Sequence, residues 1–157
     1  WSSDVCSSDL PESLIYAVIR QESRFNQKAR SPANAKGLMQ IIPSTGRWIL
    51  RQLNYKSRTI KKIYNPNINV MMGTFYIKHL SKKLDNLIFT LASYNAGVKN
   101  VSKWSQKYST KIPEKFIEQI PFYETRNYVK KVLSNYIVYE YIINGKVINY
   151  STLSKKI

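Results

Sequence analysis

Apolar residues recur every three or four positions along most of this chain, which is the spacing of α-helices that bury one face. Residues typical of helix boundaries interrupt the pattern: Ser31-Pro32 and Gly37 fall in a polar stretch, Asn65-Pro66 precedes an apolar run, and Gly97 and Gly145 follow others. The pattern predicts helices over roughly residues 11–26, 43–54, 65–84, 86–97, 98–108, 113–120 and 125–143, with a tail that could carry a short β strand. We therefore expect a mainly α domain of about seven helices with little or no β structure.

The chain has 157 residues, enough for one domain that buries its own core without a metal or disulfides. Its first ten residues, WSSDVCSSDL, have no periodicity and contain the only cysteine, Cys6. We interpret residues 1–10 as a non-native leader and residues 11–157 as a single domain. A domain without cysteine is compatible with export, and we expect any targeting or anchor segment to lie outside this sequence.

The formal net charge is +16, so the surface should attract an anionic partner: nucleic acid, lipid headgroups or an acidic wall polymer. The lysines occur singly or in pairs along the whole chain, which is more typical of a dispersed solvated surface than of a nucleic-acid-binding arm. No apolar run reaches the roughly 18 residues needed to cross a bilayer.

Glu22 occupies a position where the first predicted helix calls for an apolar side chain. Ile15, Val18 and Ile19 precede it by seven, four and three residues, and Phe25 follows it by three, so all share one helix face. Burial disfavours the charged form of a carboxyl group and raises its pKa, and a general acid must keep its proton near neutral pH. The alternative is a structural carboxylate that pairs with a neighbouring arginine.

Other common catalytic chemistries have no motif here: the sequence lacks CxxC, HExxH, a glycine-rich phosphate loop and GxSxG. The single histidine, His79, is more typical of a surface or packing residue than of a ligand, so we expect no metal and no cofactor. Glu124 lies where an extended segment enters the last predicted helix. The structural alternative to a role in a site is that its negative charge interacts favourably with the dipole of that helix. Tyr94 and Asn95 lie at a helix end, where they could project into a cleft or simply cap the helix.

Five segments in a fixed order resemble a known family. ESRF, GLMQIIPSTG, NPNINVMMGTFYI, ASYNAG and IPFYETRNYV are similar to segments of the soluble and membrane-bound lytic murein transglycosylases, within the lysozyme-like superfamily. The resemblance covers about residues 11–141 and implies a lysozyme-like fold.

The resemblance implies that Glu22 is the single catalytic acid/base. It also implies a set of substrate-binding residues: Ser23, Ser31, Gly37, Leu38, Met39, Gln40, Tyr94, Asn95, Glu124 and Tyr128. Met39 and Gln40 would contact the glycan, and Tyr94 and Asn95 would lie near the acid. Glu124 and Tyr128 would support the cleft. One departure bears on loop geometry, because Asn34 stands where the family usually has glycine.

The implied reaction cleaves the β-1,4 bond between N-acetylmuramic acid and N-acetylglucosamine without water and leaves 1,6-anhydromuramoyl ends. The implied partners are peptidoglycan glycan strands in the periplasm or cell envelope. We expect a monomer with peripheral envelope association and no specific nucleic-acid partner. Three alternatives stay open: a hydrolytic muramidase, a noncatalytic peptidoglycan-binding or secretion-associated module, and a nucleic-acid-binding domain suggested by charge alone.

Overall fold

The computed structural model describes residues 10–108 and 112–149. Within these ranges the chain forms seven α-helices and one short 3-10 helix, and its only β structure is two isolated bridges. The helices are α1 (Glu12–Ser23), α2 (Pro43–Gln52), the 3-10 helix η1 (Ser57–Lys62), α3 (Pro66–Leu84), α4 (Leu87–Ala96), α5 (Val98–Lys107), α6 (Pro113–Gln119) and α7 (Tyr123–Asn144). The predicted mainly α architecture is therefore confirmed.

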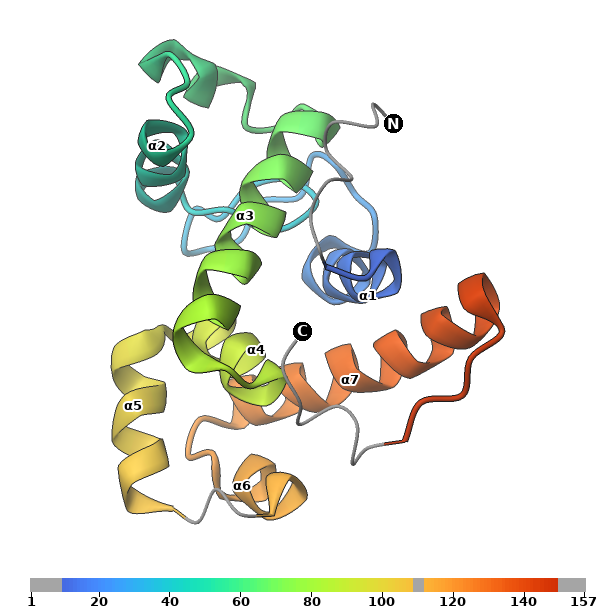
Figure 1. Ribbon diagram of the computed structural model, residues 1–157. Helices are drawn as coiled ribbons and strands as arrows, with labels where there is room; N and C mark the ends of the chain where they lie inside the picture. Colours follow the sequence, from blue (N-terminus) through green and yellow to red (C-terminus); the bar gives the residue numbers. More distant parts are fainter. Residues whose placement is uncertain (1–9, 109–111, 150–157) are drawn as a thin grey trace.

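The longest helix, α7, provides the base on which α1 and α4 pack, and α3 packs on α4 (Figure 1). Ser13 near the start of α1 contacts Glu140 near the end of α7, so these two helices run antiparallel. The core lies where these helices meet. Its largest fully buried side chains include Leu14, Ile19, Met39, Ile49, Leu50, Met72, Ile77, Leu80, Leu87, Ile88, Leu91 and Phe116.

Local sequence chemistry explains most helix boundaries. Pro43, Pro66 and Pro113 each occupy the first turn of a helix, where the missing N–H costs no hydrogen bond. The Asn65 side chain caps α3 by accepting a hydrogen bond from the Ile68 amide at 3.2 Å. Gly97 ends α4 with φ +84°, a conformation that favours glycine.

The first helix ends earlier than predicted, at Ser23 rather than near Asn26. Arg24 and Phe25 both adopt left-handed conformations, with φ of 51° and 64°, so the chain leaves the helix axis at once. As a result Phe25 does not continue the apolar face, and it is 46% exposed. The prediction that Phe25 shares the buried face with Glu22 was therefore wrong.

The polar stretch between α1 and α2 is an ordered loop, in which two β-bridges pair Lys36 with Arg30 and with Ile41. Asn34 has φ +62°, so asparagine takes the left-handed conformation that the family's usual glycine would take. Past α7, residues 145–149 form no strand, and residues 150–157 of the predicted tail lie outside the described part. Leu10, the last residue of the predicted leader, packs into the core at 7% exposure. Residues 1–9 of that leader lie outside the described residues.

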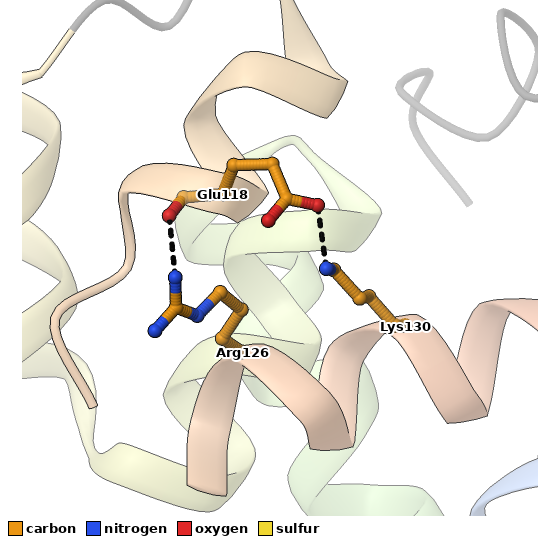
Figure 2. A network of polar contacts seen from close by, with 3 residues as sticks. All are labelled: Glu118, Arg126 and Lys130. Atoms are coloured by element: carbon orange, nitrogen blue, oxygen red, sulfur yellow. Dashed lines mark hydrogen bonds and ion pairs between the residues drawn. The ribbon is translucent and has the colours of Figure 1, made fainter. Parts of the chain in front are cut away.

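A polar clamp fastens α6 to the start of α7 (Figure 2). The Arg126 guanidinium donates to the Glu118 backbone carbonyl at 3.0 Å, and the Lys130 ammonium lies 2.5 Å from the Glu118 carboxylate. No helix in the described part of the chain is both long and apolar enough to cross a membrane.

Candidate active site

Glu22 lies in the last turn of α1 and is half-buried. Burial raises its pKa from 4.5 to about 7, which is the largest effect on this carboxyl group. The Tyr128 hydroxyl opposes the shift by lowering the pKa of Glu22, and the negative charge of Glu124 raises it further. The site therefore holds a carboxyl group that is about half protonated near neutral pH.

Tyr128 lies on α7 opposite Glu22 and is buried, with 4% of its surface exposed. Burial raises the pKa of Tyr128 well above its usual range, and the Glu22 charge adds to this effect. Its hydroxyl interacts with the Glu22 carboxyl in a hydrogen-bonding contact that lowers the Glu22 pKa, although within the described residues no partner of this hydroxyl meets strict hydrogen-bond geometry. An unsatisfied buried hydroxyl is a group that a ligand or a rotated carboxyl could satisfy.

Tyr94 comes from the last turn of α4 and joins the same site. Its hydroxyl donates to the Met39 carbonyl at 2.8 Å, which links α4 to the loop before α2. Burial raises the pKa of Tyr94 well above its usual range, and the charges of Glu22 and Tyr76 contribute in the same direction. The Tyr76 ring lies 5.5 Å from the Tyr94 ring, so aromatic contact continues from the site onto α3.

Asn95 and Glu124 lie where α4 meets the start of α7. The Asn95 side-chain oxygen accepts a hydrogen bond from the Thr125 hydroxyl at 2.7 Å. Thr125 follows Glu124 directly in the chain. Glu124 is exposed in the first turn of α7, where its negative charge interacts favourably with the helix dipole. Its second role here is electrostatic, because its charge acts on Glu22.

The loop that carries Gly37, Leu38 and Met39 is held by Asn69, a fully buried residue of α3. The Asn69 oxygen accepts from the Met39 amide at 2.7 Å, and its nitrogen donates to the carbonyls of Lys36 at 2.9 Å and Ile63 at 2.8 Å. Gly37 has φ +79°, and a Cβ there would collide with the Asn69 side chain. The sequence predicted no role for Asn69. An asparagine among the apolar residues of a predicted helix does, however, indicate a polar side chain that needs hydrogen-bond partners in the core.

Several predicted substrate-binding residues use their polar groups internally. Ser23 donates to the Ile19 carbonyl of its own helix at 3.2 Å, and the Ser31 hydroxyl accepts from the Ala35 amide at 3.1 Å. Gln40 is partly accessible and donates to two carbonyls of its own loop. Met39 has no exposed surface, and Leu38 is 8% exposed. Contact of Met39 with a glycan would therefore require movement of the loop.

The structure thus brings Glu22 together with Tyr94, Tyr128 and Glu124, and it places Asn95 at the α4–α7 junction beside them. Ser23, Ser31 and the Gly37–Gln40 segment form supporting structure around this group. Among the described residues, no three His, Cys, Asp or Glu side chains gather as a metal site would require. What the arrangement offers is proton transfer by one carboxyl group beside the buried phenol of Tyr128 and the partly buried phenol of Tyr94.

Comparison with known families gives two matches. The transglycosylase SLT domain matches residues 1–117 of the chain. The soluble lytic transglycosylase helical domain matches residues 119–147, which include α7.

Individual proteins show the same relationship. The soluble lytic murein transglycosylase of Escherichia coli K12 is 36% identical over 141 residues, which cover 88% of this chain and 22% of that protein. The structure of an inactive mutant of the lytic transglycosylase Slt from Pseudomonas aeruginosa superposes with a TM-score of 0.87 at 30% identity, covering 97% of this chain and 25% of that one. The 70 kDa soluble lytic transglycosylase of Escherichia coli superposes with a TM-score of 0.85 at 31% identity, over 99% of this chain and 27% of that one. The chain thus spans about a quarter of the length of these relatives.

Proposed function

Because this chain belongs to the transglycosylase SLT domain family, we propose that it is a lytic transglycosylase with Glu22 as its acid/base. The substrate is peptidoglycan, and the bond cleaved is the β-1,4 linkage from N-acetylmuramic acid to N-acetylglucosamine. The observation that carries the proposal is the half-buried carboxyl of Glu22, whose pKa is raised to about 7 beside Tyr94 and Tyr128.

Glu22 performs both proton transfers in this proposal. Its protonated form donates to the glycosidic oxygen, and the bond to the leaving N-acetylglucosamine breaks with assistance from the substrate's own N-acetyl group. Glu22 is then a carboxylate, and it accepts the proton of the muramoyl C6 hydroxyl as that oxygen closes the 1,6-anhydro ring. A pKa of about 7 suits a group that must be acid in one step and base in the next.

The surroundings support a reaction without a protein nucleophile. Hydrolytic glycosidases usually place two carboxyl groups on either side of the scissile bond. Here the carboxylate that acts on Glu22 is Glu124, which is exposed in the first turn of α7 and not enclosed with the acid. The neighbours packed around Glu22 are the phenols of Tyr94 and Tyr128; the Tyr128 hydroxyl can donate a hydrogen bond to a substrate oxygen, whereas the Tyr94 hydroxyl donates to the Met39 carbonyl.

We further propose that the domain works as a monomer at the cell envelope, where murein lies. Its net charge of +16 favours loose attachment to a wall that carries peptide carboxylates. Wall binding would raise the local concentration of substrate without a dedicated anchoring contact.

Mass spectrometry of digested murein tests this proposal. The wild-type protein should release muropeptides that are lighter by one water than those made by a hydrolase, because anhydro ends replace reducing ends. Glu22→Gln should lower the rate at least about 1,000-fold while keeping the helical circular dichroism spectrum. Glu114→Gln, an exposed carboxyl in the first turn of α6, is the matched control and should cleave normally.

The same digest separates the alternatives. Reducing ends in place of anhydro ends would make the protein a muramidase. Binding to murein with no product would make it a noncatalytic wall-binding module. Full activity of Glu22→Gln would refute the assignment of the acid.

A further inference from the structure

A cavity of about 390 Å³ is formed by residues of α2, α3 and the start of α5 (Figure 1). We call it the α2–α3 cavity. Its described lining residues combine aromatic and apolar side chains with hydroxyl and basic groups: Ser44, Thr45, Trp48, Tyr76, His79, Leu80, Lys83 and Val98. Sites for small molecules and sugars typically have such a mixed lining and a volume of about 300 to about 1,000 Å³.

The Trp48 ring in the α2–α3 cavity is partly exposed and is held by neighbouring rings. It forms T-shaped pairs with His79, at 4.9 Å between ring centroids, and with Tyr76, at 6.2 Å. Phe75 contacts it at 6.1 Å. A ring that its neighbours already fix loses little conformational freedom when a ligand packs on it. The cavity therefore presents a preformed aromatic surface.

The α2–α3 cavity is joined to the proposed active site through two elements. On α3, the Tyr76 ring lines the cavity and lies 5.5 Å from the Tyr94 ring. Burial and then the charge of Glu22 raise the pKa of Tyr94, because the two side chains lie near each other. At the α4–α5 junction, Val98 lines the cavity and follows Asn95 by three residues. Tyr94 thus links the proposed acid to the cavity lining.

Trp48 lies one ring further from the acid than Tyr94 does. The Tyr76 ring contacts both of these rings and stands between them along this path. A sugar that packs on Trp48 is therefore a different sugar from the one whose bond meets Glu22. Because the proposed substrate is a polymer, one strand can occupy both places.

The chemistry of the lining matches a sugar ring. A pyranose has an apolar face of C–H groups and a rim of hydroxyl and acetamido groups. Its apolar face can pack on the Trp48 ring, and its rim can form hydrogen bonds with the Ser44 and Thr45 hydroxyls and the Lys83 ammonium.

We propose that the α2–α3 cavity binds an N-acetylated sugar of the glycan strand, beyond the disaccharide next to the cleaved bond, with its ring stacked on Trp48. This inference rests on the proposed function, because it assigns a further part of the same substrate. Contacts with a remote sugar can lower the barrier at the reacting bond. Long strands should therefore be cleaved with a higher kcat/KM than short ones.

Cleavage of stem-free murein oligosaccharides of two lengths tests the proposal. A tetrasaccharide has one disaccharide on each side of the scissile bond and would not reach the cavity, whereas an octasaccharide would. On the octasaccharide, kcat/KM of Trp48→Leu should fall about tenfold, because leucine keeps apolar packing but has no flat ring face. On the tetrasaccharide its loss should not exceed that of Tyr55→Leu, a control that changes an exposed ring beyond the end of α2.

A conservative variant separates sugar stacking from support of the fold. Trp48→Phe keeps a ring in the cavity, so its kcat/KM on the octasaccharide should stay within about threefold of wild type. Equal losses of Trp48→Leu on both oligosaccharides would overturn the proposal. So would a loss in Trp48→Phe as large as that in Trp48→Leu.

Tryptophan fluorescence tests binding apart from catalysis. The octasaccharide, titrated into the Glu22→Gln protein, should change the tryptophan emission, and the tetrasaccharide should not. The change should disappear in Glu22→Gln/Trp48→Phe, in which Trp1 and Trp104 are the remaining tryptophans. An emission change that persists in this double variant would refute the role of the cavity. Absence of anhydro products from both oligosaccharides with the wild-type protein would instead refute the proposed function, and the titration would still decide whether the cavity binds glycan.

Discussion

At the scale of single residues, the burial that suits Glu22 to the proposed acid/base role also lowers the stability of the fold. The protein surroundings disfavour its ionised form, so the folded chain holds the Glu22 proton more tightly than the unfolded chain does. The proposed mechanism requires that proton, and the fold becomes less stable as the proton is lost. The same burial therefore makes the acid useful and the fold less stable at neutral pH.

The pH dependence of folding follows from this shift. Below pH 4.5 Glu22 is protonated in both states and adds no penalty, whereas between pH 4.5 and about 7 the unfolded chain ionises first and stability falls. The difference between the two pKa values corresponds to at most about 3 kcal/mol. Glu22→Gln should thus be about as stable as wild type at pH 4 and more stable, by up to about 3 kcal/mol, at pH 8.

Urea unfolding at the two pH values measures the difference. Glu114→Gln, which changes an exposed carboxyl on α6, should differ from wild type by less than about 0.5 kcal/mol at both. A Glu22→Gln variant that is less stable than wild type at pH 8 would contradict the raised pKa.

At the scale of elements, α3 positions the loop that Tyr94 contacts. Asn69 bonds three backbone groups of the chain around it, and Gly73 leaves room for the Met39 side chain, which a Cβ would strike. Met39 in turn presents its carbonyl to Tyr94. One helix therefore determines the loop geometry and, through the loop, the placement of a phenol beside Glu22.

We expect Asn69→Ala to destabilise the domain by about 3 kcal/mol, because it leaves the Met39 amide and the Ile63 carbonyl without these partners and removes one of the two hydrogen bonds to the Lys36 carbonyl, which keeps the Ile41 amide. Hydrogen exchange of the Met39 amide should become faster, and murein cleavage should fall with it. Asn67→Ala, an exposed change two residues earlier on α3, is the control and should leave exchange at Met39 unaltered. Normal protection of Met39 in Asn69→Ala would show that the loop does not depend on this side chain.

At the scale of the whole molecule, the excess of positive charge is distributed over many elements. One surface cavity is lined in part by Arg58, Lys61 and Lys62 of η1, and another, between α1 and α7, is lined in part by Arg20, Arg24 and Lys131, although the two lie apart. Such a surface can attract an anionic polymer in many orientations, and in the proposed function contacts near Glu22 would select the productive one.

Attachment to the wall should therefore depend on salt. Binding of Glu22→Gln to insoluble murein should weaken severalfold between about 50 and about 500 mM NaCl, because exposed charges are screened over shorter distances at high salt. Sedimentation with murein measures this, and the inactive variant prevents digestion of the matrix. Salt-independent binding would show that apolar or hydrogen-bonded contacts dominate attachment.

The sequence by itself determined the helices, most of their ends and the family. These follow from local causes: apolar periodicity, the prolines at Pro43, Pro66 and Pro113, and the glycine at Gly97. It also singled out Glu22, because a carboxylate on an apolar helix face is visible without coordinates. The early end of α1 was missed, since two consecutive left-handed residues other than glycine carry no simple sequence signal.

Only the tertiary structure decided what surrounds Glu22. The hydrogen bond between Asn95 and Thr125 and the bonds of Asn69 to Met39 and Lys36 each join residues that lie 30 to 33 positions apart in the sequence. The buried hydrogen bond from the Ser13 hydroxyl to the Glu140 carboxylate likewise joins α1 to α7 and fixes their register, while Asn144 of α7 donates to the same carboxylate. The raised pKa of Glu22 depends on that register, because Glu22 of α1 and Tyr128 of α7 approach each other only when the two helices pack.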